Sequence, residues 1–312
     1  MQITTTSFTS GFLNQIDQLE SQQSTLQNES TTGLKVSLPE DNPSVMDQVL
    51  NLQTESSANT QYQSNITALQ TTATTASAAL NSLQTIVEDA SEIATEAGGV
   101  TSSTQMSTYA TQVGNLIQEA LQLGNTKDAN GNYIFGGTAT GAPPFTAATN
   151  ASGDVTGITY NGNTSVAKSE IAPGLTVSAQ SPGENNTGSG AGGVFADSRT
   201  GADLFSHLIS LQQDLSSGNT SAIASTDTPN LNNDEDNVVT QVSANGVLQS
   251  ALTSAGDVAT QKSTSLDTQM SDDTNADLAQ TLTQLSQTQT AYQAALESGT
   301  MVMSLSLLNF LQ

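Results

Sequence analysis

His207 is the residue best suited to acid–base chemistry, because it is the only histidine in the chain of 312 residues. A Ser-His-Asp arrangement would therefore have to use it. Its neighbours are apolar, however, and include Leu204, Phe205 and Leu208. This setting favours a partly buried or interfacial position on a helix over a catalytic one.

Two short motifs have the letters of ligand-binding loops. Residues 188–193 fit G-x-G-x-x-G, but no helix pattern opens directly after them and no βαβ unit surrounds them, so we interpret them as a flexible loop. Asp128, Asn130 and Asn132 alternate as calcium-loop ligands do. The twelfth position of such a loop needs an acidic residue and here is Ala139, which indicates an ordinary turn.

Other groups offer no stronger site. Glu88, Glu92 and Glu96 recur on one helix face, which favours a solvated strip or a face toward a neighbouring chain over a metal site. Cysteine is absent, which excludes disulfides, thiolate metal ligands and thiol nucleophiles. We therefore expect no catalytic residue, no metal and no cofactor.

The charge balance restricts the partners. Lys plus Arg total 5 against 29 Asp plus Glu, a formal charge of -24, which disfavours nucleic acid and anionic lipid. No apolar run reaches 18 residues, so we expect no membrane span. Residues 1–19 lack the features of a cleavable signal, so the chain is expected to be cytosolic or exported by another route. A pI near 4.1 would suit an acidic medium, where carboxylates lose their mutual repulsion.

The two ends of the chain carry matching apolar patterns with helical spacing. Near the C-terminus, apolar residues recur at steps of three, four or seven: Leu278, Leu282, Leu285, Tyr292, Leu296, Met303, Leu307 and Phe310. The N-terminal residues with this spacing are Phe8, Phe12, Ile16, Leu19 and Leu26. We expect the two ends to pair as a coiled coil. Because so narrow a seam is marginal on its own, we expect these residues to form an assembly interface and to become ordered when neighbouring copies cover them.

The segments between the ends predict long helices around a β-rich insert. Helix is expected over residues 6–28, then a connector over 34–41, and Asn42 with Pro43 is a helix start signal. Residues 44–97 contain no proline or glycine and predict one long helix, followed by a shorter one over 104–123 that folds back along it. Residues 128–198 show brief alternating runs separated by the turn pairs Asn161-Gly162 and Pro173-Gly174.

After the insert the pattern is helical again. It resumes at Asp203, and residues 216–233 are expected to be a loose segment. The acidic residues 234–236 favour the start of another long helix to about residue 270, and a break at 271–275 precedes the last helix. The predicted fold is mainly α with a small, mostly antiparallel β-domain inserted in a helical rod. Its predicted domains are a terminal coiled coil (1–40 and 276–312), a rod (41–127 and 203–275) and a β-rich outer domain (128–202).

Three segments resemble the flagellin superfamily, and within it the hook–filament junction proteins. Residues 32–36 and 39–43, which include Gly33 and Pro43, are similar to the connector before the family's first long helix. The run Tyr133, Ile134, Phe135 and Gly136 resembles the entry into the junction proteins' β-domain. Residues 277–311 resemble the family's C-terminal helix. Together these segments span most of the chain.

The resemblance implies a structural role outside the cell. It implies export through the flagellar type III apparatus, with an export chaperone, and assembly as a ring between the first junction protein on the hook and the flagellin filament. Two other interpretations stay open: a flagellin or minor filament subunit, and a secreted adhesin that binds through the β-domain on a helical stalk. An enzyme is a more distant alternative and would depend on His207.

Overall fold

The computed structural model describes the backbone of residues 2–99, 102–151 and 153–310, and the side chains of residues 10–99, 102–151 and 153–301. The chain divides into two compact units. One consists of Met1–Ala58 with Lys262–Gln312, and the other of Asn59–Gln261. Helices α2 (Pro43–Ala97) and α6 (Thr228–Thr274) contribute to both units. The further division of the helices into a terminal coiled coil and a rod stays a prediction.

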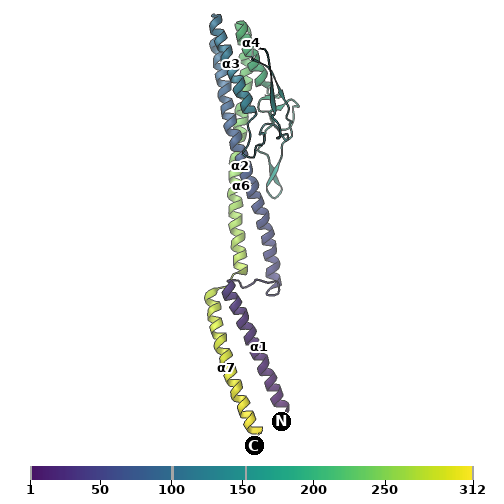
Figure 1. The fold of residues 1–312 in the computed structure, drawn as a ribbon, viewed down its shortest axis with the longest axis vertical. Helices are drawn as coiled ribbons and strands as arrows, with labels where there is room; N and C mark the ends of the chain where they lie inside the picture. The colour runs from purple at the N-terminus through teal and green to yellow at the C-terminus, as the bar shows by residue number, and fades with distance from the viewer. Residues whose placement is uncertain (1, 100–101, 152, 311–312) are drawn as a thin grey trace. The chain divides into compact units, whose positions relative to one another are not determined.

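The first unit contains the two terminal helices. α1 (Gln2–Thr32) and α7 (Leu278–Phe310) lie side by side and run in opposite directions (Figure 1). α1 ends because Gly33 adopts a left-handed conformation with φ of 73°, which a residue with a side chain rarely takes. α7 begins after Asp277, whose Oδ1 accepts hydrogen bonds from the backbone N–H of Ala279 and Gln280. The predicted pairing of the two ends is confirmed.

The start of α2 follows the predicted signal. The side-chain oxygen of Asn42 accepts a hydrogen bond from the backbone N–H of Val45 at 3.2 Å, and Pro43 is the first helical residue. α2 then continues to Ala97, as the absence of proline and glycine after Pro43 predicts. α3 (Ser103–Gly124) lies along α2, and the Tyr109 hydroxyl of α3 donates to Glu96 of α2 at 2.9 Å.

The segment expected to be loose is largely helical, so that prediction is wrong. α4 (Leu204–Ser217) ends at Gly218, and α5 (Thr220–Ala222) continues through a π-helical turn (Ile223–Asp227) directly into α6. The acidic residues 234–236 therefore lie inside α6 and do not start it. They were misleading because Asp234 is a buried tertiary contact of α4 and not a helix cap.

The β-rich insert is built from short strands in three small sheets. β1 (Phe145–Thr149) pairs antiparallel with β2 (Val155–Tyr160), and β3 (Ser169–Ala172) pairs antiparallel with β4 (Leu175–Val177) around the predicted Pro173-Gly174 turn. In the third sheet, β6 (Ala196–Asp197) lies between β5 (Glu184–Asn185), parallel, and β7 (Ala202–Asp203), antiparallel. Asn161-Gly162 does not connect paired strands, because β2 and β3 belong to different sheets.

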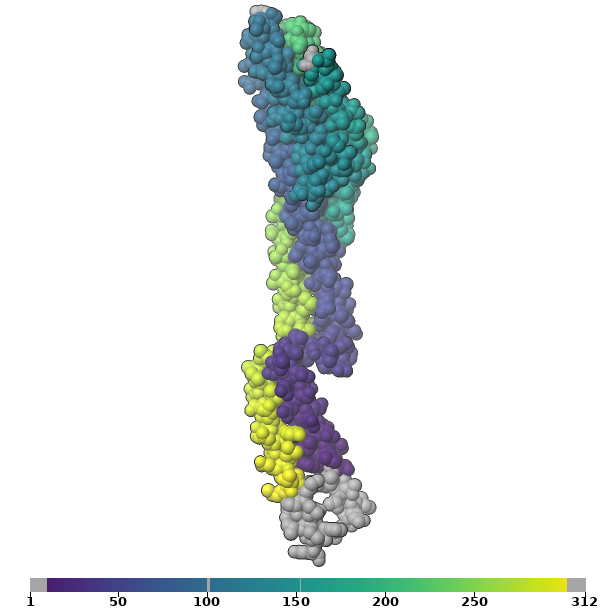
Figure 2. Space-filling view, viewed as in Figure 1, coloured from purple at the N-terminus to yellow at the C-terminus, as the bar shows by residue number. Residues whose placement is uncertain are grey.

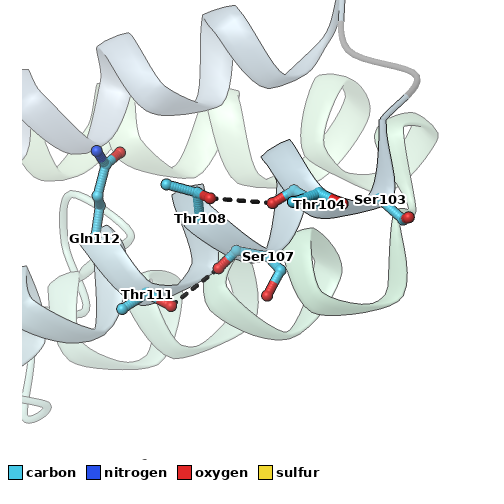
Figure 3. Close-up of a pocket in the computed structure, with 6 residues that line it drawn as sticks. All are labelled: Ser103, Thr104, Ser107, Thr108, Thr111 and Gln112. Atoms are coloured by element: carbon cyan, nitrogen blue, oxygen red, sulfur yellow. Dashed lines mark hydrogen bonds between the residues drawn. The ribbon is translucent and has the colours of Figure 1, made fainter.

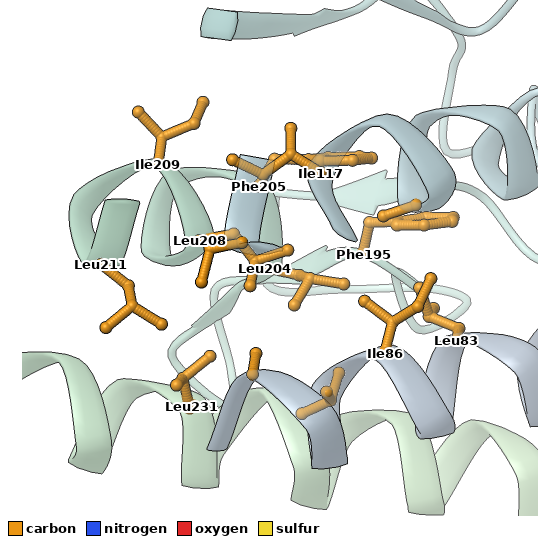
Figure 4. Close-up of a cluster of buried hydrophobic side chains, with 14 of the residues drawn as sticks. Leu83, Ile86, Ile117, Phe195, Leu204, Phe205, Leu208, Ile209, Leu211 and Leu231 are labelled. Atoms are coloured by element: carbon orange, nitrogen blue, oxygen red, sulfur yellow. The ribbon is translucent and has the colours of Figure 1, made fainter. Parts of the chain in front are cut away.

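The larger core of the second unit joins the insert to the helices. Phe195 of the insert and Phe205 of α4 have parallel rings 5.1 Å apart, and Phe145 lies 4.9 Å from Phe195. Figure 4 shows Phe195 and Phe205 beside leucines of α4 and beside Leu83 and Ile86 of α2. In the space-filling view the insert forms a broad teal layer against the helices of this unit (Figure 2). The aromatic residues therefore fasten the insert to the helices.

A smaller core lies under the β3–β4 hairpin. Ile171 and Ala179 pack with Ile66 and Leu69 of α2 and Leu252 of α6. The amide of Asn65 also donates to the Glu170 carbonyl oxygen at 2.8 Å. Within the described residues, every helix falls short of the length and apolar character that crossing a bilayer would require.

Candidate assembly interface

The contact between α1 and α7 follows a heptad pattern. On α1, buried or half-buried residues recur at alternating steps of four and three over Phe12, Ile16, Leu19, Gln23 and Leu26. On α7 the pattern continues through polar and small residues: Thr281, Leu285, Thr288, Tyr292, Ala295 and Gly299. These residues form the seam, and only two of its six α7 positions, Leu285 and Tyr292, carry large side chains.

Because Gly299 has no side chain, the ring of Phe12 packs directly against its backbone. A Cβ atom at position 299 would lie 2.2 Å from the tip of this ring, which is far inside contact distance. The close approach fixes the register at this end of the described seam. At the other end, the backbone N–H of Ala276 donates to the carbonyl oxygen of Gly33 at 2.9 Å.

The connector that follows α1 is held by backbone hydrogen bonds and one carboxylate. The Lys35 N–H donates to the Thr274 carbonyl oxygen at 2.7 Å. Oδ2 of Asp41 accepts from the backbone N–H groups of Ser37 and Leu38, and these bonds hold the pKa of Asp41 below its usual value. Gly33 and Pro43, two residues of the family resemblance, thus mark the two ends of an ordered connector.

Three predicted interface residues lie outside the seam and are exposed. The exposed fractions are 48% for Leu278, 53% for Leu282 and 42% for Leu296. Leu282 and Leu296 each follow a seam residue by one position, and Leu278 lies about one helical turn before Leu282. All three therefore lie on one flank of α7. We call them the leucine stripe. Leu13, on α1, is also 53% exposed.

The structure thus separates the predicted interface residues into two sets. Phe12, Ile16, Leu19, Leu26, Leu285 and Tyr292 lie in the seam, and Leu278, Leu282 and Leu296 form the leucine stripe. The side chains of Phe8, Met303, Leu307 and Phe310 lie outside the described residues. The sequence interpretation missed Thr281, Thr288 and Gly299, which extending the heptad through polar residues would have found.

The run Tyr133 to Gly136 connects the insert to the helices. Ile134 and Phe135 are buried, and the carbonyl oxygen of Phe135 accepts from the Gly183 N–H at 2.7 Å and the Tyr160 hydroxyl at 2.9 Å. Nζ of Lys127 lies 4.7 Å from the centroid of the Tyr133 ring. A Cβ atom at Gly136 would lie 2.5 Å from a backbone oxygen, so only glycine fits without rearrangement. These contacts give the run a structural role in the core.

His207 is partly buried on a helix, as predicted. Its Nδ1 lies 2.8 Å from Oδ2 of Asp234, and Oδ1 of Asp234 accepts from the backbone N–H of Asp203 at 2.8 Å. Burial lowers the pKa of His207, but the hydrogen bond and charge of Asp234 raise it by more, so the net direction is upward. The pair connects α4 to α6 and leaves the histidine engaged in a structural contact.

In both loop motifs, side chains of the loop or of nearby residues form hydrogen bonds with the loop backbone. Oδ1 of Asp128 accepts from the backbone N–H groups of Asn130 and Asn132, which is the expected turn. In the glycine-rich loop, the buried amide of Asn185 donates to the carbonyl oxygens of Ser189 and Ala191. Oδ2 of Asp197 accepts from the Gly193 N–H at 3.0 Å, and Asp197 also pairs with Arg199. The polar groups of the glycine-rich loop are therefore bonded to buried side chains of the protein itself, which argues against a phosphate-binding role.

Two hollows on the helices are lined mainly by hydroxyl, amide and small side chains. One, of about 630 Å³, lies along α3 and is lined by Ser103, Thr104, Ser107, Thr108, Thr111 and Gln112 (Figure 3). Its threonine hydroxyls donate to carbonyl oxygens of their own helix. A second, of about 720 Å³, lies between α3, α4 and the β1–β2 hairpin, and its lining contains no aromatic ring for a sugar to stack on.

Comparison with known sequences gives one family and a set of related proteins. Residues 3–140 match the family described as the bacterial flagellin N-terminal helical region. Over 120 residues the chain is 31% identical to flagellar hook-associated protein 3 of Salmonella typhimurium. This alignment covers 38% of the chain and 38% of that protein, so the sequence likeness spans well under half of either.

Comparison with solved structures extends the likeness in fold. A putative flagellar hook-associated protein from Vibrio parahaemolyticus superposes with a TM-score of 0.63 at 20% identity, over 75% of this chain and all of the other. Hook-associated protein 3 of Legionella pneumophila superposes with a TM-score of 0.57 at 16% identity, over 77% of this chain and 99% of the other. At these identities the structural likeness concerns the fold alone.

Proposed function

We propose that this chain is a member of the flagellin superfamily and a hook-associated structural component of the bacterial flagellum, because residues 3–140 match the flagellin N-terminal helical region and 120 residues are 31% identical to a flagellar hook-associated protein 3. More specifically, it is the adaptor between hook and filament. It is exported through the type III apparatus with a chaperone and forms a ring outside the cell. Its partners are copies of itself, the first junction protein on the hook and flagellin. It binds no cofactor and has no enzymatic activity.

The observation that supports self-assembly is the leucine stripe beside the seam. The seam has threonine, alanine or glycine at four of its six α7 positions, while three leucines of the same helix stay exposed. Large apolar side chains on the outside of a polar seam favour burial against another chain. We place neighbouring subunits there, together with Phe8, Met303, Leu307 and Phe310.

A deletion strain tests the role. Cells lacking the gene should build complete hooks, carry no filament and release flagellin into the medium, and the wild-type gene should restore filaments. A gene carrying Leu278→Ser, Leu282→Ser and Leu296→Ser should fail to restore them. The matched control, Gln280→Ser, Gln284→Ser and Gln287→Ser on exposed positions of α7, should restore them.

Other results would select another function. Filaments in the deletion strain would contradict the junction role. Purified subunits that polymerise unaided into long filaments would indicate a flagellin or minor filament subunit. Saturable glycan binding by the purified chain, with normal filaments in the deletion strain, would indicate an adhesin.

A further inference from the structure

Asp227 is a buried carboxylate that the flagellar role does not explain. It is 0% exposed and ends the π-helical turn Ile223–Asp227 between α4 and α6. Its Oδ1 accepts a hydrogen bond from the Ser210 hydroxyl at 2.8 Å. Its Oδ2 is buried and has no hydrogen-bond partner within the described chain. Such an atom loses its hydration without replacement, which is costly for a charged group.

A second carboxylate meets Asp227 at this place. Asp214, on α4, interacts directly with Asp227, and its Oδ1 accepts from the amide of Asn219 at 3.2 Å. Burial raises the pKa of Asp227, the Ser210 hydrogen bond opposes this, and the charge of Asp214 adds to it. Two adjacent carboxylates cannot both stay ionised without a positive charge between or beside them.

Within the described chain, the charge of His207 lowers the pKa of Asp227, but His207 forms no ion pair with it. Among the described residues, Arg199 pairs with Asp197, Lys262 pairs with Glu55, and His207 pairs with Asp234. No ion pair of the described chain involves Asp214 or Asp227. The site therefore combines two carboxylates that form no ion pair with a buried oxygen that accepts no hydrogen bond from the described chain.

We propose that Asp214 and Asp227 bind a hard divalent cation, calcium foremost, at the turn between α4 and α6. The available donors are oxygens: the carboxylates of both residues and the Ser210 hydroxyl. Calcium accepts such irregular oxygen sets together with water, whereas magnesium demands near-octahedral geometry. Asp214 is only half-buried, which leaves a side open for water to complete the shell. The bound ion would hold α4 and the π-helical turn together.

The test measures calcium binding and thermal unfolding of the full chain at neutral pH in about 150 mM salt, where diffuse surface binding is screened. Calorimetry should find one calcium site. At about 100 times the dissociation constant, calcium should raise the unfolding temperature by about 5 °C, and magnesium should raise it less. Asp227→Asn and Asp214→Asn should each remove the response. The matched control Asp236→Asn, an exposed acid on α6, should keep it.

Two results would overturn the proposal. One is an equal calcium response in wild type, Asp227→Asn and Asp214→Asn, which would mean diffuse surface binding. The other is no calcium response, with wild type losing stability as the pH rises above about 4 and Asp227→Asn not doing so, which would mean a shared proton. Because Asp214→Asn alters a half-buried residue, it decides the question even if Asp227→Asn folds poorly. Neither result depends on whether the chain acts in a flagellum.

Discussion

The α1–α7 pair and the core beneath the β insert differ in what they bury. The seam of the pair has threonine, glycine or alanine at four of its six α7 positions and leaves three leucines exposed. The core of the other unit buries Phe135, Phe145 and Phe195 almost completely, with ring centroids 4.9 to 5.5 Å apart. Aromatic side chains bury far more apolar surface each than threonine does.

This difference indicates different sources of stability. The core beneath the insert has extensive apolar contacts and a partly buried His207–Asp234 pair within one chain. The α1–α7 pair has a thin seam and unused apolar surface on its outside. We infer that the first region is stable in the isolated subunit, and that the second gains much of its stability from neighbouring subunits.

The largest loss of stability is expected from Phe195→Ala. Phe195 is 1% exposed and its ring contacts three other phenylalanines, so truncation leaves a cavity in the core. We expect a loss of about 3 to 5 kcal/mol in the free energy of unfolding, measured by urea titration of the purified chain. Phe12→Ala, in the half-buried seam, should cost clearly less. Equal costs would contradict the difference between the two regions.

His207→Gln tests the polar contact of the same core. The variant removes a charged partner from buried Asp234 and should cost about 2 to 3 kcal/mol. Because the folded pKa of His207 is raised, its contribution is full below about pH 6.5 and is lost as the pH rises through the folded value. The stability difference between variant and wild type should therefore shrink from pH 6 to pH 9. A constant difference would rule out a charged pair.

Gly299→Ala tests the seam itself. The new methyl group would meet the Phe12 ring at 2.2 Å, so the ring must move, and we expect a cost of about 1 to 3 kcal/mol in the α1–α7 pair. Hydrogen exchange of peptides from residues 10–32 and 278–301 should report it. Gly11→Ala is the control, because a Cβ at Gly11 meets nothing within 4 Å. That change should stabilise helix α1 by about 0.5 to 1 kcal/mol.

Glu184→Gln is expected to change the stability less, and the change should depend on pH. Burial and then the charge of Asp203 raise the pKa of Glu184 from 4.5 to about 7. The folded state therefore binds the extra proton between these values, and wild-type stability should fall as the pH rises through that window. The variant should not show this fall in unfolding temperature, whereas Glu119→Gln, at an exposed site, should retain it. An identical pH profile for wild type and Glu184→Gln would contradict the assignment.

The long helices were predictable because their signals are local. A stretch without proline or glycine, the Asn42-Pro43 start and the glycine after α1 each act within a few residues, and α2 has nearly the expected bounds. The prediction for residues 216–233 was wrong for the opposite reason. Its helical state is supported by long-range contacts, since Ile223 and Leu231 are buried in the core and Asp227 accepts a hydrogen bond from Ser210 of α4. No local pattern shows those contacts.

The candidate interface was predictable only in its apolar residues. The search for apolar spacing found Ile16, Leu26 and Leu285 in the seam. It could not find Thr281 or Thr288, because polar residues at heptad positions carry no hydrophobic signal. It also could not separate the seam from the leucine stripe, because both have helical spacing and differ only in which flank meets α1. That distinction requires the position of the second helix.

The smallest effect on the isolated subunit is expected from the leucine stripe. Leu278→Ser, Leu282→Ser and Leu296→Ser alter side chains that are 42% to 53% exposed, so each should change the free energy of unfolding by no more than about 0.5 kcal/mol. The same three changes should nevertheless prevent assembly, because we propose that the surface they remove is covered by another chain. Urea titration of the monomer and filament counts in complemented cells measure the two effects separately. A large loss of monomer stability would mean that the stripe packs within the subunit, and the contrast between the two regions would then be wrong.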